Sequence, residues 1–460
     1  MNHQTSTLGR VLGVLAAGFL FSRTVLGDPI APEAEANTEK SFPTGNVIFI
    51  HPDGAGLSTW SALRLLEAGP DGSIAWDELE HISIYKGHMS DAIGASSNGG
   101  ATAHAYGIRP KRKSFGTDGK EPIRALSGSD KSIMLEAKEA GILVGAINSG
   151  HLCEPGTAVF LASSEDRYDF DWITKEIFKA KPDLYFAGGE GYILPAGVRG
   201  VHVGNGRRKD GDDLRTMAAT LGIHLIHTTQ EMMDLEPAKL PVIGLFADEN
   251  TYNDQAEVLN ILARQGHYKP DAPDVATMLT TALRLFSSQE KPFFLVVEEE
   301  GTDNFANYNN AGGTLEAARR ANAAIRVALD FQRENPDTLV LVAADSEAGG
   351  LAIYGPELRE NSREMVPGVP LRMSNLSNGA PLDGVHGAMT VPFLAAPDAK
   401  GVRLPFAISW AGFQDFHGGI VVRARGLNAD TLTPLVSNVD MYRVMYRTLF
   451  GVEPGAKGGL

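Results

Sequence analysis

Apolar segments of strand length recur along the chain from Asn46 onward, and stretches with helical spacing separate them. This alternation is typical of a largely parallel sheet that helices cover on both faces. The pattern therefore predicts an α/β fold with a large, mostly parallel central sheet. The predicted strands cover residues 47–51, 82–85, 143–147, 184–187, 242–246, 293–297, 338–343 and 420–424.

Helix signals are clearest in the second half of the chain. Apolar residues keep helical spacing between residues 315 and 329, and Asn335-Pro336 ends that pattern. Near the C-terminus, Ser437 with Asp440 is typical of a helix start. Residues 352–405 are instead rich in Pro, Gly, Asn and Ser, which predicts a loop-rich insertion above the sheet.

The N-terminal residues have the composition of a targeting segment. Arg10 precedes an apolar run at residues 11–21, as in a signal peptide. Because that run is too short to span a bilayer, we expect export to the periplasm or outside the cell without stable membrane insertion. The predicted organisation is a signal peptide at 1–27, a flexible leader at 28–45, a folded domain at 46–453 that contains the insertion, and a tail at 454–460.

Charge and cysteine content narrow the function classes. The formal net charge is -15, and an acidic surface repels a nucleic-acid backbone, so we expect no nucleic-acid partner. A small anionic substrate still fits if metal ions reverse the field locally. Cys153 is the single cysteine, which excludes an intramolecular disulfide even in an exported protein.

Acidic residues follow three of the predicted strands. Asp53 follows the first strand, Glu298 and Asp303 follow the strand at 293–297, and Asp345 follows the strand at 338–343. Each has an ordinary interpretation, because Asp-Gly is common in turns and exposed glutamates are common in loops. Ligands of open α/β sheets bind outside the carboxyl ends of the strands, however. Acids at three such ends together favour a metal cluster.

A fourth element, SSNGGATA at residues 96–103, combines a hydroxyl pair with small residues that can begin a helix. At a helix N-terminus, free backbone N–H groups and the helix dipole favour an alkoxide or a bound phosphate at Ser97. The alternative is an ordinary N-cap serine. Phosphate chemistry assisted by a metal would make the same hydroxyl a nucleophile.

The order of these motifs resembles the alkaline phosphatases, and the resemblance extends from about Asn46 to Gly451. It implies that Asp53 bridges two metal sites and that Ser97 is the phosphorylated nucleophile, with Ser96 as the alternative. The motifs are HPDGAG, SSNGGATA, GGEGYILP, RRKDGDDL, VEEEGTD, ADSEAGG and HGG.

The same resemblance assigns further residues one by one. Glu298 matches the glutamate of the magnesium site, and Asp303 and Asp345 match carboxylate ligands of the two zinc sites. His417 matches the last zinc histidine, since a predicted strand follows it, and His386 is its rival. Arg167 resembles the arginine that binds phosphate through two hydrogen bonds, although an insertion of about two residues is needed to align it.

Several positions depart from the family pattern. Asn307 stands where the family has a histidine four residues after the metal aspartate, and Ser346 replaces the histidine of an Asp-His pair. Glu154 takes the position of the magnesium-site threonine, and Ser96 replaces the acid before the nucleophile. Imidazole suits zinc, whereas carboxylate, amide and hydroxyl oxygens suit magnesium, calcium or manganese. We therefore expect Asn307, Ser346 and Glu154 to join a site for divalent ions that includes magnesium, with calcium, manganese or zinc at the other positions.

The activity implied by the resemblance is metal-dependent hydrolysis of phosphate monoesters through a phosphoserine intermediate. The expected partner is a small phosphate ester, and a homodimer is one expected assembly because the family often forms dimers. A phosphodiesterase of the same superfamily is one alternative. A non-catalytic relative that binds phosphate esters is another, but carboxylates kept together without metal would repel one another. A sulfatase is disfavoured, because the sequence has no Cys-x-Pro-x-Arg or Ser-x-Pro-x-Arg segment.

Metal replacement tests the expectation of oxygen-preferring ions. Metal-free protein reloaded separately with zinc, magnesium, manganese and calcium is expected to release phosphate fastest with one of the last three, because most predicted ligands are oxygens. The measurement is the initial rate of phosphate release with each ion. Activation by zinc alone would contradict the expectation.

Overall fold

A ten-stranded sheet forms the centre of the computed structural model, which describes residues 41–355 and 381–455. Its order is β19-β2-β18-β10-β1-β9-β5-β6-β8-β7, and β18 makes both antiparallel pairings, with β10 and β2. The strands are β1 (Asn46–Pro52), β2 (His81–Lys86), β5 (Leu143–His151), β6 (Leu184–Gly188), β7 (His224–Ile226), β8 (Val242–Leu245), β9 (Phe293–Glu299), β10 (Thr338–Val342), β18 (Val421–Gly426) and β19 (Leu435–Ser437).

The predicted α/β class is confirmed, and each of the eight predicted strands is present in this sheet. The sequence reading missed β7 and β19, which pair in parallel with β8 and β2. Each has only three residues. A segment that short carries too few positions for a period-2 pattern to emerge.

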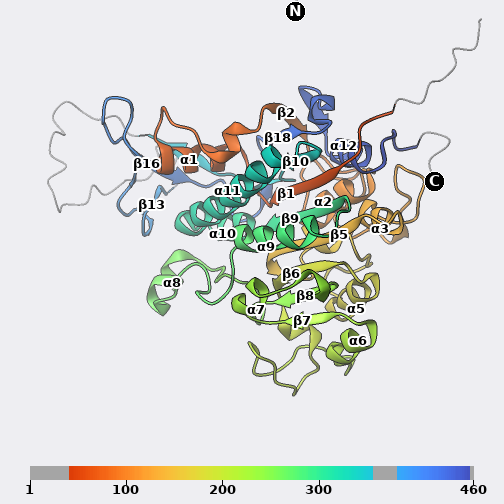
Figure 1. Ribbon diagram of the computed structural model, residues 1–460. Coiled ribbons are helices and arrows are strands. Elements are labelled where there is room, and N and C mark those ends of the chain that lie inside the picture. Colours follow the sequence, from red (N-terminus) through yellow and green to blue (C-terminus); the bar gives the residue numbers. More distant parts are fainter. Residues whose placement is uncertain (1–40, 356–380, 456–460) are drawn as a thin grey trace, which may run out of the picture. The chain divides into compact units, whose positions relative to one another are not determined.

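Helices cover both faces of the sheet. Successive side chains of each strand point to opposite faces, so each central strand contributes to two apolar clusters. Val47 and Phe49 of β1 belong to one apolar cluster, and Ile48 and Ile50 belong to the other. Figure 1 shows α9 (Val275–Ser287) and α11 (Ala311–Glu334) across the central strands. The first cluster includes α2 (Ser97–Tyr106), α3 (Ile133–Glu139), α5 (Phe170–Ala180), α6 (Leu214–Leu221) and α12 (Val439–Phe450). The second includes α1 (Leu57–Ala68), α7 (Thr229–Met233), α9 (Val275–Ser287) and α11 (Ala311–Glu334).

Two helix signals read from the sequence have clear counterparts. Helix α11 contains the apolar positions from 315 to 329 and ends at its C-cap Asn335, directly before Pro336. Helix α12 begins one residue later than the Ser437 signal suggested, with Asn438 as its N-cap. The Ser437 backbone N–H nevertheless donates to Asp440 Oδ2 at 2.7 Å.

The two described ends of the predicted insertion, together with the strand directly after it, build a small second sheet. Its order is β12-β16-β13-β14, and β15 also pairs with β16. Apolar residues of this region pack against α1 and α11 in a separate cluster that includes Ala62, Leu315 and Ile408. These strands are β12 (Ala352–Tyr354), β13 (Asp383–Gly384), β14 (Gly387–Ala388), β15 (Phe393–Leu394) and β16 (Pro405–Ser409).

The remaining strands and α-helices are short. They are the strands β3 (Thr117–Asp118), β4 (Glu121–Pro122), β11 (Glu347–Ala348) and β17 (Asp415–Phe416), and the helices α4 (Pro155–Ala158), α8 (Glu257–Ala263) and α10 (Gly301–Asn307). The predicted signal peptide, most of the leader, residues 356–380 of the insertion and most of the tail lie outside the described residues. Among the residues described, no helix combines the length and apolar character that a membrane crossing requires.

Removal of a core side chain from β10 tests the central role of this sheet. Leu341 is fully buried, so Leu341→Ala should lower the free energy of unfolding by about 2–5 kcal/mol through lost burial and a cavity. Leu435 on β19 is 54% exposed, and Leu435→Ala should change it by less than about 0.5 kcal/mol. Urea unfolding of both variants measures the difference, and equal effects would contradict this account of the core.

Candidate metal centre and nucleophile

Four strand ends lie side by side because β10, β1, β9 and β5 are neighbours in the sheet. The register pairs His51 of β1 with Glu298 of β9, and Glu298 in turn with Asn148 of β5. Asp53, directly after β1, therefore lies close to acids from both neighbouring strand ends. Its carboxylate can share one ion with His51 and Asp345, or with Glu300 and Asp303, and the ligand atoms within each group lie within 4.8 Å of one another.

Buried polar atoms with no hydrogen-bond partner among the described residues gather at these strand ends. An unpaired buried polar atom costs free energy, so such a concentration indicates a missing ligand. Oxygen atoms predominate, and His51 adds one nitrogen. The atoms are His51 Nε2, both Asp53 Oδ atoms, Glu298 Oε1, Glu299 Oε2, Glu300 Oε2, Asp303 Oδ1, Asn307 Oδ1, both Asp345 Oδ atoms and Ser346 Oγ.

Without a cation, the protein environment disfavours the charged forms of most of these buried acids. Burial raises the pKa of Glu298 to about 8, and it raises the pKa values of Glu300, Asp303 and Asp345 well above their usual range. Burial would also raise the pKa of Asp53, but the neighbouring His51 side chain lowers it, with a further contribution from the Ser97 hydroxyl. Divalent cations would neutralise this cluster, so its residues fit a metal centre.

Glu298 is held in position by β5 and α4. Its Oε2 accepts hydrogen bonds from Asn148 Nδ2 and, at 3.3 Å, from Thr157 Oγ1, which leaves Oε1 free for a ligand. Helix α4 packs so closely that a Cβ on Gly156 would overlap Oε1. Position 156 therefore requires glycine. The carboxylate is oriented by neighbours rather than left to rotate.

Asp303 and Asn307 lie one turn apart on α10. Asn307 Nδ2 donates to Asp303 Oδ2 and to Asp415 Oδ1, both at 2.9 Å. Free carboxylate and amide oxygens, Asp303 Oδ1 and Asn307 Oδ1, remain for an ion. Gly54 adopts φ +65°, and a Cβ there would approach Asp303 Oδ1 to 2.7 Å, so the turn after β1 can pass close to this carboxylate only as glycine.

Asp345 and Ser346 follow β10, and both side chains are 1% exposed. Neither carboxylate oxygen of Asp345 nor Ser346 Oγ has a hydrogen-bond partner among the described residues. The first turn of α2 passes directly over Asp345, because a Cβ on Gly100 would overlap its Oδ2. The start of α2 and the end of β10 are thus in contact.

Ser97 is the first residue of α2 and is buried beside Asp53, whose pKa it helps to lower. Its neighbour Ser96 is the N-cap residue and directs its hydroxyl elsewhere, toward the backbone oxygen of Arg112 and Asn98 Oδ1. The two serines therefore differ in availability. The geometry favours Ser97 as the hydroxyl that faces the cluster.

Glu154 and Arg167 pair with each other instead of standing alone. Glu154 Oε1 lies 3.0 Å from His151 Nε2, and its Oε2 lies 3.6 Å from an Arg167 nitrogen. Glu154 is buried, whereas the Arg167 side chain is 30% exposed. Arg167 is therefore tethered at the rim of the site and still reaches solvent.

The two histidine candidates from the sequence lie on the surface. His417 follows β17 and is exposed, as is His386 between β13 and β14. Neither belongs to the groups of ligand atoms that converge on Asp53 within the described parts of the chain. The acid two residues before His417, Asp415, is the side chain that meets Asn307.

Sequence reasoning missed His51, Glu300 and Asp415. His51 and Asp53 are two positions apart on an extended segment and so share one side of the sheet, a signal that was available. Glu299 and Glu300 follow Glu298 in the sequence like solvated loop residues, but they are only 1% and 3% exposed. No local pattern marks Asp415.

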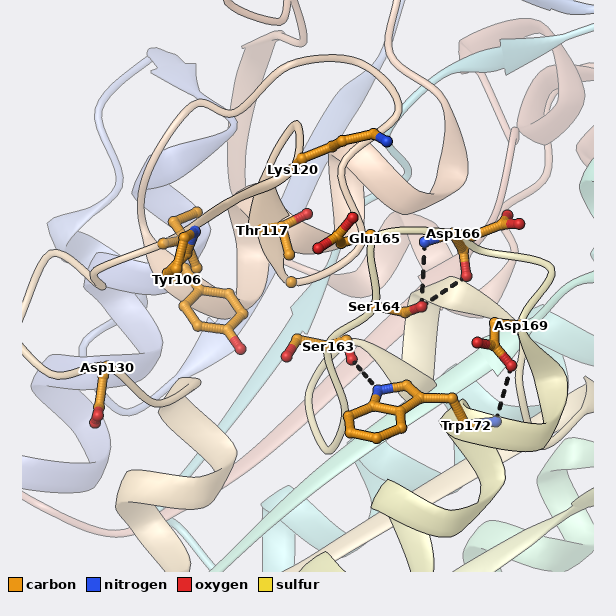
Figure 2. Close-up of a pocket in the computed structure, with 13 residues that line it drawn as sticks. Tyr106, Thr117, Lys120, Asp130, Ser163, Ser164, Glu165, Asp166, Asp169 and Trp172 are labelled. Atoms are coloured by element: carbon orange, nitrogen blue, oxygen red, sulfur yellow. Dashed lines mark hydrogen bonds between the residues drawn. The ribbon is translucent and has the colours of Figure 1, made fainter.

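A separate cleft of about 660 Å³ lies along the segment from Ser163 to Asp169, which also carries Arg167 (Figure 2). Its lining includes the acids Asp130, Glu165 and Asp166 but none of the residues that converge on Asp53. Trp172 lines it as well, and its indole nitrogen donates to the Ser163 backbone oxygen at 2.9 Å. The carboxylate cluster is therefore distinct from this cleft.

The chain belongs to the alkaline phosphatase family, whose model matches residues 44–366. Alkaline phosphatase of Escherichia coli strain K12 is 24% identical over 378 residues, which cover 74% of this chain and 77% of that protein. Streptomycin-6-phosphate phosphatase of Streptomyces griseus is 24% identical over 363 residues, which cover 68% and 76%.

Solved structures agree on the fold. Alkaline phosphatase of Thermus thermophilus superposes with a TM-score of 0.67 at 19% identity, covering 92% of this chain and 95% of that one. A variant of the TAB5 alkaline phosphatase with Mg bound in its M3 site superposes with a TM-score of 0.66 at 19% identity, covering 88% and 98%. Family membership makes this chain a hydrolase of phosphate esters that depends on divalent metal ions.

Replacing one acid of the cluster by its amide should test two expectations: that the acids destabilise the metal-free fold, and that they bind the ion. In metal-free protein at pH 8, Asp345→Asn should raise the free energy of unfolding by about 1–3 kcal/mol, because it removes one of several mutually repelling buried charges. Excess Mg²⁺ should stabilise the variant less than the wild type, because one ligand is lost.

Thermal unfolding with and without Mg²⁺ measures both effects. The exposed Asp430 supplies a control, since Asp430→Asn should change neither value appreciably. A destabilised metal-free Asp345→Asn protein would contradict the view that the cluster requires a cation.

Proposed function

We propose that the protein is an exported phosphomonoesterase that works through a phosphoserine intermediate on Ser97. The observation that carries the proposal is the position of Ser97, at the N-terminus of a ten-residue helix and beside Asp53. A hydroxyl there faces both a cation-binding cluster and the positive end of the α2 dipole. Phosphoryl transfer gains most of its rate from such positioning and charge.

The residues proposed as metal ligands come from all four strand ends and the segments that follow them. When bound, divalent ions would supply positive charge for the phosphate group and lower the pKa of the attacking hydroxyl. Mg is one expected ion, in keeping with the Mg-bound TAB5 relative, and Ca, Mn or Zn are candidates for the other positions. The proposed ligands are Asp53, Glu154, Glu298, Glu300, Asp303, Asn307, Asp345 and Ser346.

The chemistry divides into two displacements. Ser97 Oγ gives up its proton and bonds to phosphorus while the bond from phosphorus to the leaving oxygen breaks, and the leaving oxygen takes a proton. Water then attacks the phosphoserine, which releases inorganic phosphate and restores the hydroxyl. An ion pair with Glu154 holds Arg167 at the rim of the site. From there its guanidinium can donate hydrogen bonds to two phosphate oxygens.

Monoesters are the proposed substrates because the curated relatives carry such names as alkaline phosphatase and streptomycin-6-phosphate phosphatase. The enzyme should hydrolyse p-nitrophenyl phosphate at least about 100-fold more efficiently than bis-p-nitrophenyl phosphate, a difference of about 2.7 kcal/mol in transition-state stabilisation. Comparison of the two kcat/KM values tests the proposal. A preference for the diester would favour the phosphodiesterase alternative.

Replacement of each serine tests the nucleophile. Ser97→Ala should abolish phosphoenzyme formation and reduce kcat by roughly 10³-fold or more, since the attacking atom is lost. Ser96→Ala should keep the phosphoenzyme, because that hydroxyl is engaged with the Arg112 backbone.

Acid-quenched reactions with ³²P-labelled substrate measure the phosphoenzyme directly. If phosphoenzyme persists in Ser97→Ala and disappears in Ser96→Ala, the assignment is wrong.

A further inference from the structure

We propose that His51 Nε2 is a metal ligand, in one site with Asp53 and Asp345. This proposal deepens the proposed function and rests on its metal centre. It supplies an imidazole to the ion whose family histidine is replaced here by Ser346. The chemical class of the ligand is a divalent cation that accepts mixed nitrogen and oxygen donors, such as Zn²⁺.

The hydrogen bond of His51 defines which ring nitrogen is free. Nδ1 lies 2.8 Å from the backbone oxygen of Ala343, and a carbonyl oxygen can only accept. Nδ1 therefore carries a proton and donates, which leaves the Nε2 lone pair available in the neutral ring. Metal-binding histidines commonly donate their other ring nitrogen to a backbone carbonyl in this way.

The free nitrogen points at the cluster. His51 is 1% exposed, and Nε2 has no hydrogen-bond partner among the described residues. It lies 3.5 Å from Asp53 Oδ1, and one ligand atom from each of His51, Asp53 and Asp345 lies within 4.8 Å of the other two. Donors thus converge from β1, from the turn after it and from the end of β10.

The 3.5 Å separation suits a shared ion better than a direct ion pair. A protonated imidazole bonded to a carboxylate would bring nitrogen and oxygen to about 2.7–2.9 Å. Two ligand atoms of a tetrahedral zinc ion, each about 2.0–2.2 Å from the metal, lie roughly 3.4 Å apart. The observed spacing matches the second arrangement.

The ring is also fixed by its packing. Phe49 and His104 contact it with centroid separations of 5.9 and 5.6 Å, and His104 Nε2 lies 2.8 Å from the hydroxyl oxygen of Tyr85. These neighbours, with Ala343, restrict rotation of the His51 ring. A ligand held in this way needs little ordering when an ion binds.

Metal-bound NMR tests the assignment without reference to activity. The metal-free protein, labelled with ¹⁵N in histidine, is loaded with ¹¹³Cd²⁺, and coupling between cadmium and ring nitrogens is recorded. One coupling should arise from an Nε2 whose ring retains a protonated Nδ1. It should disappear in His51→Asn, whose amide can still donate to Ala343, and persist in His417→Gln.

Zinc affinity supplies the second measurement. Competition with a chelator should show that His51→Asn weakens Zn²⁺ binding at least about tenfold, while Mg²⁺ affinity changes less than about twofold because imidazole is a poor magnesium ligand. His417→Gln is the matched control. Unchanged or tighter Zn²⁺ binding in folded His51→Asn would overturn the proposal and identify His51 as a charged partner of Asp53.

If the His51→Asn variant does not fold, the spectrum of the cadmium-loaded wild-type protein still tests the assignment. Absence of any such cadmium coupling, or its loss in His417→Gln, would overturn the proposal. The two hypotheses also fail separately. Cadmium coupling at His51 in a protein that does not hydrolyse phosphate esters would refute the proposed function alone, and hydrolysis without that coupling would refute the ligand assignment alone.

Discussion

The structure depends on one electrostatic constraint: several carboxylates are buried together where adjacent strands of the central sheet end. Asp53, Glu298 and Asp345 are each at most 1% exposed, and most of their oxygens lack a protein partner among the described residues. Burial of like charges is unfavourable unless a cation neutralises them. A divalent cation bound among these acids would therefore stabilise the fold at this end of the sheet.

The apolar sheet makes this arrangement rigid. β1, β9 and β10 are buried on both faces by two apolar clusters, so their ends cannot shift to relieve repulsion. Glycines at positions 54, 100 and 156 let the neighbouring backbone approach the acids within distances that no Cβ would allow. The free energy of core packing thus offsets the repulsion among these acids. Strain at a functional site is commonly offset elsewhere in a protein in this way.

Asn307 and Ser346, which the sequence resemblance aligns with histidines of the family, each offer an oxygen atom to the site. Asn307 donates to Asp303 and Asp415 at once, so an amide connects two carboxylates where an imidazole would bind metal through one nitrogen. Ser346 keeps an oxygen at the next position. The proposed role of His51 would add a nitrogen ligand to the site from strand β1.

The sequence by itself determined the α/β class, the eight longer strands and the acids at their ends, because strand periodicity and the residue after each strand are local properties of the chain. It did not reveal that Glu300 is buried, that Ser96 turns away from the cluster, or that Asp415 contacts Asn307. Those features depend on distances between segments far apart in the chain. They follow from the strand order β10-β1-β9-β5 and from the contact between α2 and Asp345. Only tertiary packing brings these distant segments together.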